Sequence, residues 1–378
     1  MNAPTEDFVL NAAQRAEVIT GLNQILPAHA VLHEVEDTKP YECDGLSLFR
    51  QLPMVVALPE TEEQVIQILK LANRLNVPVV ARGAGTGLSG GAQPHKHGIL
   101  LGMAKFNKIL KVDVQSRSAV VQPGVRNLAI SEAVAQHQLY YAPDPSSQIA
   151  CTIGGNVAEN SGGVHCLKYG LTVHNVLKVR AITIEGEIVE FGSEAPDAPG
   201  LELMNLVIGS EGMLAVVTEV TVKLVPKPAL AQVIMASFDD VANAGNAVAA
   251  VIAAGIIPAG LEMMDKRASQ MVEPFVKAGY DTEAEAILLL ESDGTPEEVA
   301  EEIAEMTRVL NGCGATAIKV SQSEAERLKF WAGRKNAFPA AGRVSPDYYC
   351  MDGTIPRRRL ADVLNAITEM EKKYDMRC

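Results

Sequence analysis

The sequence lacks features that mark several classes of protein. Its six cysteines form no C-x-x-C pair, so neither an iron–sulfur cluster nor a zinc ribbon has its usual ligand spacing, and a reducing compartment suits them. The net charge is -13 and the body of the chain has no Lys/Arg-rich run, which argues against nucleic-acid binding. The one dense basic run, at residues 357–359, is typical of a solvated helix start.

Signals for export or membrane insertion are also missing. Residues 1–14 carry acidic residues where a signal peptide has basic ones, and no apolar segment follows, so we expect a cytoplasmic protein. Residues 241–261 are uncharged and long enough to span a bilayer. Their small residues, followed by Gly255 and Pro258, predict instead a helix packed on a sheet and then a strand.

A chain of 378 residues is longer than one ordinary core, so we expect two or more domains. Residues 53–58 predict a strand, residues 62–75 a helix capped by Thr61, and residues 77–82 a second strand, which together form a β-α-β unit. Alternating and β-branched segments continue to residue 226, and this region is predicted to be α+β.

A Pro-x-Pro sequence at residues 226–228 marks the predicted domain boundary. Beyond it, long helices are predicted to alternate with strands. The helices are expected at residues 239–254 and 296–311, and the strands at residues 257–263 and 315–320. The predicted parts are an N-terminal helical arm (residues 1–50), a domain at residues 51–228 and a further domain at residues 229–378.

The sharpest motif is residues 82–91, Arg-Gly-Ala-Gly-Thr-Gly-Leu-Ser-Gly-Gly, directly after a predicted strand. Glycine has no Cβ to block close approach and can adopt positive φ, so the backbone N–H groups of such a run can face an anion. We interpret the motif as a cradle for a pyrophosphate. A glycine-rich turn without a ligand is the alternative.

Residues 85–90 also match G-x-G-x-x-G, the fingerprint of nicotinamide dinucleotide sites. That fingerprint needs a helix that opens within the glycines, with its N-terminus at the phosphates. Here Gln-Pro-His-Lys-His-Gly follows at residues 93–98 and cannot begin a long helix. The context therefore disfavours NAD.

Two more segments are rich in glycine. Residues 152–163 (TIGGNVAENSGG) follow Pro-Asp-Pro-Ser-Ser at residues 143–147, and residues 209–214 (GSEGML) lead into a predicted strand. Separate loops of Gly, Ser and Asn in one domain indicate a large ligand held from both sides, such as a dinucleotide with an extended ring system. Three such loops are far more specific than one.

The order of these motifs resembles the vanillyl-alcohol-oxidase/PCMH family of FAD enzymes over roughly residues 50–228. The resemblance rests on Pro59-x-Thr61 before a helix and on the motifs at residues 82–87, 143–147, 152–156 and 209–212. Residues 41–53 and 148–170 are similar to the glycolate oxidase and D-lactate dehydrogenase branch of that family.

The resemblance implies an α+β fold, in which a PCMH-type FAD-binding domain of two subdomains is followed by an α/β cap domain with an antiparallel sheet. FAD would lie between the subdomains, with residues 211–214 on the adenosine side. Covalent relatives have a histidine where this chain has Thr86, so FAD is expected to be non-covalent. The implied cofactor-binding residues are Arg82, Gly83, Ala84, Gly85, Thr86, Gly87, Leu88, Ser89, Pro143, Asp144, Ser147, Thr152, Gly154, Gly155, Asn156, Asn160, Gly163, Glu211, Gly212 and Leu214.

The cap domain would begin after Pro228 and select the substrate. Trp331-x-x-Arg334 resembles the motif whose arginine binds the substrate carboxylate in the hydroxy-acid branch, which makes Arg334 the implied catalytic residue. A guanidinium suits this role because it can bind a carboxylate through two hydrogen bonds. An ordinary arginine on a helix surface is the alternative. Relatives that take a second carboxylate tend to have a lysine near Cys350, and its absence favours a monocarboxylate.

No histidine is assigned to catalysis or to a metal. His95, His97, His165 and His174 qualify by residue type alone, and His165 is a candidate for contact with the flavin. The family's histidine-containing segment after the cap does not occur before the chain ends. We therefore expect the C-terminal FAD-oxidase segment to be incomplete.

The activity that the resemblance implies is FAD-dependent oxidation of a small 2-hydroxy acid, glycolate or D-lactate, to the 2-oxo acid. Electrons would pass to iron–sulfur and second flavoprotein subunits of an oxidase complex and on to the respiratory chain. Those subunits would hold a cytoplasmic protein at the inner face of the membrane. Two alternatives stay open: a stand-alone D-lactate or D-2-hydroxyglutarate dehydrogenase, and a non-catalytic FAD-binding scaffold.

Overall fold

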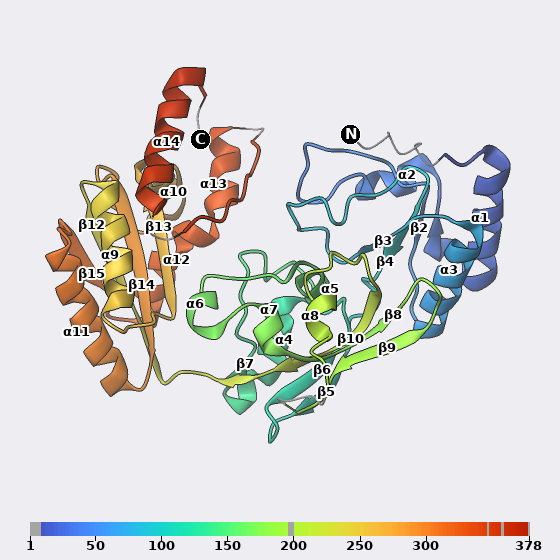
Figure 1. Cartoon of the computed structure of the whole chain (residues 1–378), viewed down its shortest axis with the longest axis horizontal. Helices are drawn as coiled ribbons and strands as arrows, with labels where there is room; N and C mark the ends of the chain where they lie inside the picture. The colour runs from blue at the N-terminus through green and yellow to red at the C-terminus, as the bar shows by residue number, and fades with distance from the viewer. Residues whose placement is uncertain (1–8, 196–199, 346–347, 357–358, 377–378) are drawn as a thin grey trace. The chain divides into compact units, whose positions relative to one another are not determined.

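The computed structural model describes residues 9–195, 200–345, 348–356 and 359–376 (Figure 1). The contacts within the chain divide it into two compact units. The first comprises Met1–Gly163 and Gly170–Pro226, and the second comprises Val164–Tyr169 and Lys227–Cys378. The segment Val164–Tyr169 thus belongs to the second unit although its sequence neighbours on both sides belong to the first. The domain limits expected at residues 50 and 228 stay predictions.

One part of the first unit contains a four-stranded sheet of order β1-β2-β4-β3. The strands are β1 (Val31–Leu32), β2 (Val55–Ala57), β3 (Val79–Arg82) and β4 (Ile99–Gly102). Both β2 and β3 pair with β4 in parallel, so the two strands of the predicted β-α-β unit are parallel with β4 between them. The crossover helix α3 (Glu62–Leu75) begins after Thr61, whose hydroxyl accepts a hydrogen bond from the Gln64 N–H, as predicted.

The N-terminal helix α1 (Ala12–Ile25) shares a hydrophobic core with this sheet. Its residues Val18 and Leu22 are buried in the same cluster as Val65 and Ile68 of α3. The capping box between Asn11 and Gln14 fixes the start of α1. The connection to β2 contains the short helix α2 (Val35–Thr38) and the 3-10 turns Ala28–Ala30 and Lys39–Tyr41.

The other part of the first unit is a five-stranded antiparallel sheet of order β5-β6-β10-β8-β9. Its strands are β5 (Ile109–Asp113), β6 (Ser118–Val121), β8 (Val176–Ile182), β9 (Ile188–Gly192) and β10 (Val216–Lys223). The helices α4 (Asn127–Val134), α5 (Ile153–Glu159) and α8 (Met204–Val207) bury apolar residues in the core of this sheet. The remaining elements are the 3-10 turn Ala135–His137, the helix α7 (Thr172–Asn175) and the strand pair β7 (Leu139–Tyr140) and β11 (Val225–Pro226).

Two findings concern the glycine-rich segments. Residues 83–98 contain no helix, so the NAD alternative lacks the helix that it requires. Residues 153–159, which were predicted to form a loop, form the helix α5. That expectation was wrong because Thr152 has the extended conformation of an N-cap, while Gly154 lies so close to Pro123 that a Cβ there would be 2.5 Å from the Pro123 Cβ. The glycines here permit close packing of a helix.

The second unit is a three-layer structure around an antiparallel sheet of order β13-β14-β12-β15, as the predicted cap domain requires. The strands are β12 (Leu230–Phe238), β13 (Gly260–Asp265), β14 (Ala286–Gly294) and β15 (Ala317–Val320). Alternate residues of β12 and β14 enter two separate cores. One core includes α9 (Val241–Ala253) and α11 (Pro296–Gly312), and the other includes α10 (Lys266–Val276), α12 (Glu324–Lys335) and α13 (Ala337–Val344) (Figure 1).

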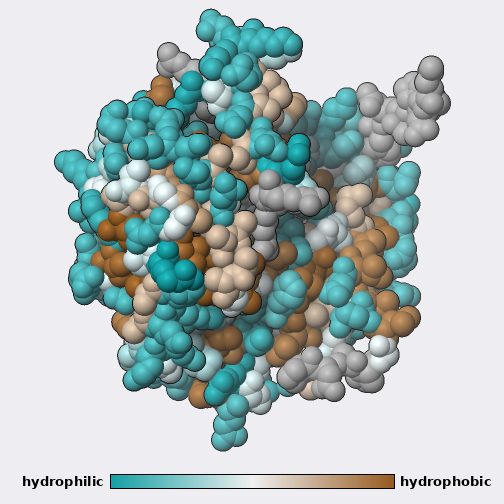
Figure 2. Space-filling model, turned by 60° about the vertical axis from the view of Figure 1, so that its left-hand side comes forward, coloured by the Kyte–Doolittle hydropathy of each residue, from teal (hydrophilic) through white to brown (hydrophobic). Residues whose placement is uncertain are grey.

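Within the described ranges, no helix has both the length and the hydropathy needed to span a bilayer. The uncharged stretch at residues 241–261 forms α9 and the start of β13, which agrees with the predicted helix and strand. The last helix, α14 (Leu360–Tyr374), packs against α9. Hydrophobic residues also reach the surface in patches between hydrophilic ones (Figure 2). In the C-terminal part the exposed ones include Met351, Met370 and Tyr374.

Candidate functional site

Arg82, at the end of β3, anchors the first glycine-rich loop. Its side chain is buried and donates hydrogen bonds to the carbonyl oxygens of Cys43 at 2.6 Å and Tyr41 at 3.3 Å. Burial lowers the pKa of Arg82 from its usual value, and the nearby Asp44 opposes this shift. Gly85 has a φ of +68°, and a Cβ there would lie 2.4 Å from Arg82 Nη2. The guanidinium therefore holds the loop to residues 41–43, and its predicted contact with a cofactor stays a prediction.

Glycines bring the predicted cofactor segments of the first unit together. A Cβ on Gly83 would lie 2.2 Å from Thr152 Oγ1, and one on Gly91 would lie 2.3 Å from Glu211 Oε2. Residues 83–91 are therefore in close contact with both the start of α5 and residues 209–214. The Pro-Asp-Pro-Ser-Ser loop contacts the end of the glycine-rich segment 152–163, because a Cβ on Gly163 would lie 2.5 Å from an Asp144 carboxylate oxygen. The structure thus gathers four segments that are far apart in the sequence.

Thr152 has a hydroxyl that no described group satisfies. Its Oγ1 is buried and has no hydrogen-bond partner. The backbone N–H groups of Ile153 and Gly154 next to it donate to the carbonyls of Val125 and Pro123, which fixes the position of α5. An unsatisfied buried hydroxyl lowers stability unless a ligand or water binds it. Thr152 is therefore a suitable group for contacting a bound cofactor.

Asn156, another predicted cofactor residue, lies in a buried amide network. Its Oδ1 accepts from Asn127 Nδ2 at 3.2 Å, and its Nδ2 donates to Ser161 Oγ at 3.2 Å. Asn127 Nδ2 also donates to the Pro143 carbonyl at 3.1 Å, so this side chain links α5 to residues 143–147. Asn127 was not predicted from the sequence. A polar residue at the start of the apolar helical segment 127–134 is the signal that could have revealed it.

Residues 209–214 are attached to the C-terminal half of α5. The N–H groups of Gly209 and Glu211 donate to the carbonyls of Val157 and Ala158, both at 2.8 Å. Partial burial and the nearby Glu159 raise the pKa of the Glu211 carboxyl. Beyond Glu211, Gly212 has a φ of +73° with open space around its Cβ position, and Leu214 is exposed. The chain here presents backbone and an apolar side chain to the surroundings.

The other predicted cofactor residues lie in the same four segments. Gly87 has no atom within 4 Å of a Cβ position, so its backbone is open to close approach. Asn160 has a φ of +58° and ends α5, and its side chain accepts a hydrogen bond from the Val173 N–H at 3.0 Å. Ala84 and Ser89 are exposed, whereas Thr86 and Leu88 are partly buried. Pro143 is buried, and Ser147 and Gly155 complete the set in residues 143–155.

Arg334, the predicted substrate-binding residue, lies near the end of α12 in the second unit. Its Nε donates to Glu262 Oε2 on β13 at 2.7 Å, and the side chain is 35% exposed. Neither of its two terminal nitrogens has a hydrogen bond to a described residue. Glu262 therefore orients the guanidinium and leaves the end of the group available for a carboxylate.

The candidate histidines are engaged with the protein. His165 Nε2 lies 3.1 Å from the buried Glu291 carboxylate of the second unit. His95 Nδ1 accepts from the His97 N–H at 3.1 Å, and His174 Nδ1 accepts from the Leu171 N–H at 3.0 Å. Among the described residues no group of three His, Cys, Asp or Glu side chains could hold a metal ion. These contacts give His165 a place in the second unit, which the sequence did not indicate.

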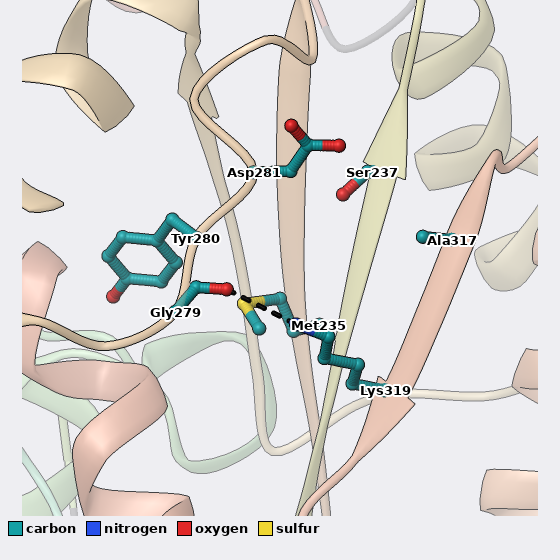
Figure 3. A pocket seen from close by; sticks show the side chains of 7 residues that line it. All are labelled: Met235, Ser237, Gly279, Tyr280, Asp281, Ala317 and Lys319. Atoms are coloured by element: carbon teal, nitrogen blue, oxygen red, sulfur yellow. Dashed lines mark hydrogen bonds between the residues drawn. The ribbon is translucent and has the colours of Figure 1, made fainter.

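The second unit also contains a pocket of about 260 Å³. Its lining residues are Met235, Ser237, Gly279, Tyr280, Asp281, Ala317 and Lys319 (Figure 3). Lys319 Nζ donates to the Gly279 carbonyl at 3.3 Å, and burial raises the pKa of Tyr280 to about 12. The Tyr280 hydroxyl donates to the Phe330 carbonyl and accepts from the Gly333 N–H at 3.0 Å. None of the predicted site residues lines this pocket, but Tyr280 binds the turn of α12 that precedes Arg334.

Two protein families match consecutive parts of the chain. The FAD binding domain matches residues 53–192, and the C-terminal domain of FAD-linked oxidases matches residues 227–378. FAD is therefore the cofactor, as predicted.

Solved structures at low identity show the same fold. An alkyldihydroxyacetonephosphate synthase has a TM-score of 0.77 at 19% identity, with 94% of this chain and 75% of that chain covered. For p-cresol methylhydroxylase the TM-score is 0.71 at 16% identity, with 85% and 70% covered.

Similar curated proteins extend over most of the chain. The glycolate oxidase subunit GlcD of Escherichia coli is 58% identical over 371 residues, which are 98% of this chain and 74% of that protein. GlcD of Bacillus subtilis is 37% identical and covers 89% of this chain and 72% of its own length. A D-lactate dehydrogenase of Anaerostipes hadrus is 30% identical over 96% of this chain and 78% of its own length.

Proposed function

Because the chain belongs to the FAD-linked oxidase family that includes the glycolate oxidase subunit GlcD, we propose that it oxidises glycolate, or a similarly small 2-hydroxy acid, to the 2-oxo acid. The similarity to GlcD over 98% of this chain carries the proposal. Bound FAD supplies the hydride acceptor, which is a chemistry that amino-acid side chains do not offer.

The four segments gathered around Gly83 and Thr152 are the proposed FAD site. Three properties support this assignment. The Thr152 hydroxyl is buried without a partner, the backbone at Gly87 and Gly212 is open to close approach, and Asn127 and Asn156 hold the surrounding segments in place. Thr86 stands where covalent relatives have a histidine, so FAD is proposed to bind without a covalent bond.

Arg334 is proposed to bind the substrate carboxylate. Its terminal nitrogens form a planar pair of donors that matches the two oxygens of a carboxylate. Glu262 holds Nε at 2.7 Å and so limits the rotation of the guanidinium. A fixed guanidinium therefore binds the carboxylate at a defined place in the site.

Electrons must leave the protein after each oxidation. We propose that iron–sulfur and second flavoprotein subunits accept them and hold the protein at the inner face of the membrane. The word "subunit" in the names of the GlcD relatives supports the existence of partners. Affinity purification of the tagged protein from its own cells, followed by iron analysis of the bound proteins, tests this part.

The decisive experiment is an absorbance spectrum of the FAD-loaded protein during anaerobic addition of glycolate, D-lactate or D-2-hydroxyglutarate. Bleaching of the flavin bands by glycolate at the lowest concentration supports the proposal. Preferential bleaching by D-lactate would instead favour the activity named for the Anaerostipes hadrus relative. Flavin bands that persist with every acid, in protein that dithionite does bleach, would indicate an FAD-binding scaffold and contradict the proposal.

A further inference from the structure

Three polar residues near the end of strand β14 are almost completely buried. Glu291, Ser292 and Asp293 are 2%, 0% and 5% exposed and follow the apolar run at residues 286–290. Removing a carboxylate from water is costly unless hydrogen bonds and opposite charges compensate. Two such carboxylates at the end of one central strand therefore require specific partners.

Two residues on one face of α12 donate hydrogen bonds to Glu291. Arg327 Nη1 lies 2.9 Å and 2.8 Å from the two carboxylate oxygens, and Trp331 Nε1 donates to Oε2 at 2.5 Å. Positions 327 and 331 are four residues apart and so lie above one another on the helix. Burial alone would raise the pKa of Glu291, but His165 and Arg327 lower it below the usual value. The carboxylate is thus a fixed negative charge beneath α12.

The same strand end binds Val164–Tyr169. His165 contacts Glu291, while Lys168 and Tyr169 donate to the two carboxylate oxygens of Asp293. Lys168 also donates to the Asp293 carbonyl at 2.6 Å. These three side chains explain why a segment so distant in the sequence belongs to the second unit. Glu291 thus bonds both to this segment and to α12.

Arg334 lies one helical turn beyond Trp331. Trp331 is 1% exposed, and its ring packs over Gly260 of β13, where a Cβ would be 3.0 Å from a ring carbon. Two residues further along β13, Glu262 binds Arg334 Nε. Glu291 fixes the rotation of α12 and its height over the sheet. These two quantities decide whether Arg334 can bind Glu262 through Nε with its terminal nitrogens directed away from Glu262.

We infer that Glu291 is a positioning residue for Arg334, acting through Arg327 and Trp331. This inference rests on the proposed role of Arg334 in binding the substrate carboxylate. Glu291 is not expected to touch the substrate, because its carboxylate oxygens are occupied by four hydrogen bonds to the protein.

A double-mutant cycle in the full-length, FAD-loaded protein tests the inference. Affinity for oxalate, an analogue of glycolate without a transferable hydrogen, is measured by the change in flavin absorbance for wild type, Glu291→Gln, Arg334→Lys and the double variant. We expect Glu291→Gln to weaken binding about tenfold in the wild-type background and less than about twofold beside Arg334→Lys, because interacting residues are not additive. Equal fold-changes in the two backgrounds would overturn the inference.

Asp293→Asn is the matched control. It removes a buried carboxylate from the same strand end and releases Lys168 and Tyr169, but in the described part of the chain Asp293 has no hydrogen bond to α12. We expect Asp293→Asn to change the oxalate affinity by the same factor in the wild-type background and in the Arg334→Lys background. Trp331→Phe replaces Glu291→Gln if the latter does not fold, since it removes one donor to Glu291 and keeps an aromatic ring in the core.

Failure of the inference and failure of the proposed function give different results. Additivity between Glu291 and Arg334, in a protein whose oxalate affinity falls with Arg334→Lys, contradicts the positioning role alone. An unchanged oxalate affinity in Arg334→Lys contradicts the role of Arg334, and with it the inference. Flavin that no 2-hydroxy acid reduces contradicts the proposed activity.

Discussion

Gly83 and Thr152 approach each other so closely that a Cβ at position 83 would lie 2.2 Å from the Thr152 hydroxyl oxygen. Gly83 follows β3, and Thr152 is the N-cap of α5. The contact joins the end of the four-stranded sheet to a helix that packs on the five-stranded sheet of the first unit. Glycine at position 83 is therefore required by the packing of the protein, independently of any ligand.

Alanine substitutions at Gly83 and Gly87 should separate packing from cofactor binding. Gly83→Ala should lower the melting temperature of the FAD-free protein, because overpacking costs about 1–3 kcal/mol, and it should also weaken FAD binding. Gly87→Ala should weaken FAD binding with little change in the melting temperature, since no protein atom lies within 4 Å of its Cβ position. Thermal unfolding of the FAD-free protein and fluorescence titration with FAD measure the two effects.

Gly312→Ala in α11 is the control, because its Cβ position is also open and it lies in the second unit. Its FAD affinity should equal that of the wild type. If Gly87→Ala binds FAD as tightly as the wild type does, the cofactor does not approach residue 87. The proposed FAD site would then not include this part of the loop.

Thr152→Val should separate the stability of the FAD-free protein from its affinity for FAD. Valine has nearly the same shape, and it removes a hydroxyl that lacks a partner, so the melting temperature should stay the same or rise. FAD affinity should fall about tenfold, which corresponds to the loss of one hydrogen bond of about 1.4 kcal/mol. Thr172→Val provides the contrast, because the Thr172 hydroxyl donates to the Ser161 carbonyl at 2.9 Å and its loss should lower the melting temperature. If Thr152→Val has a lower melting temperature than the wild type, the Thr152 hydroxyl must have a stabilising partner in the FAD-free protein, which would contradict this account.

Local sequence signals predicted the features that depend on neighbouring residues. Thr61 and the apolar spacing after it predicted α3 with the bounds that the structure has. The glycine motifs together indicated the FAD family, and the matches to the FAD binding domain and to the C-terminal domain of FAD-linked oxidases confirm it. Each of these signals reflects a backbone requirement, a cap or a close approach, that short stretches of sequence encode directly.

Features that depend on distant partners were not predicted. The central strand β14 contains the run Ala-Ile-Leu-Leu-Leu, which does not alternate because both faces of its sheet are covered, and periodicity cannot identify such a strand. Glu291 and Asp293 pair with His165, Lys168 and Tyr169, which lie more than a hundred residues earlier in the chain. The sequence near either group gives no indication of that pairing.

The pair Glu62 and Arg180 should make the stability of the first unit depend on pH. Arg180 Nε and Nη2 donate to the two Glu62 carboxylate oxygens, both at 2.9 Å, which joins α3 to β8. The hydrogen bond to Arg180 lowers the pKa of Glu62 below its usual value. Since the folded pKa lies below the unfolded one, near 4.3, the stabilisation is complete above that pH and is lost as pH falls through the folded pKa.

The comparison of Glu62→Gln with wild type measures this effect. At pH 7 the variant should be less stable by about 1 kcal/mol, as for a partly exposed pair, and the difference in melting temperature should shrink as pH falls below about 4. Glu63→Gln is the control, because Glu63 lies in the same first turn but, among the described residues, accepts a hydrogen bond from Gln67 alone. A difference between Glu62→Gln and wild type that stays constant across this range would contradict the account.

Arg334→Gln should raise the KM for glycolate while changing kcat little. A guanidinium that binds the carboxylate equally in the ground state and the transition state contributes uniform binding, so its loss appears in KM. Loss of a charge-assisted pair is worth about 3 kcal/mol, which corresponds to a rise in KM on the order of 100-fold. Lys335→Gln is the matched control, since it removes a positive charge from the next position of α12. If both variants raise KM to the same extent, net charge explains the effect, whereas a rise confined to Arg334→Gln identifies a specific carboxylate contact.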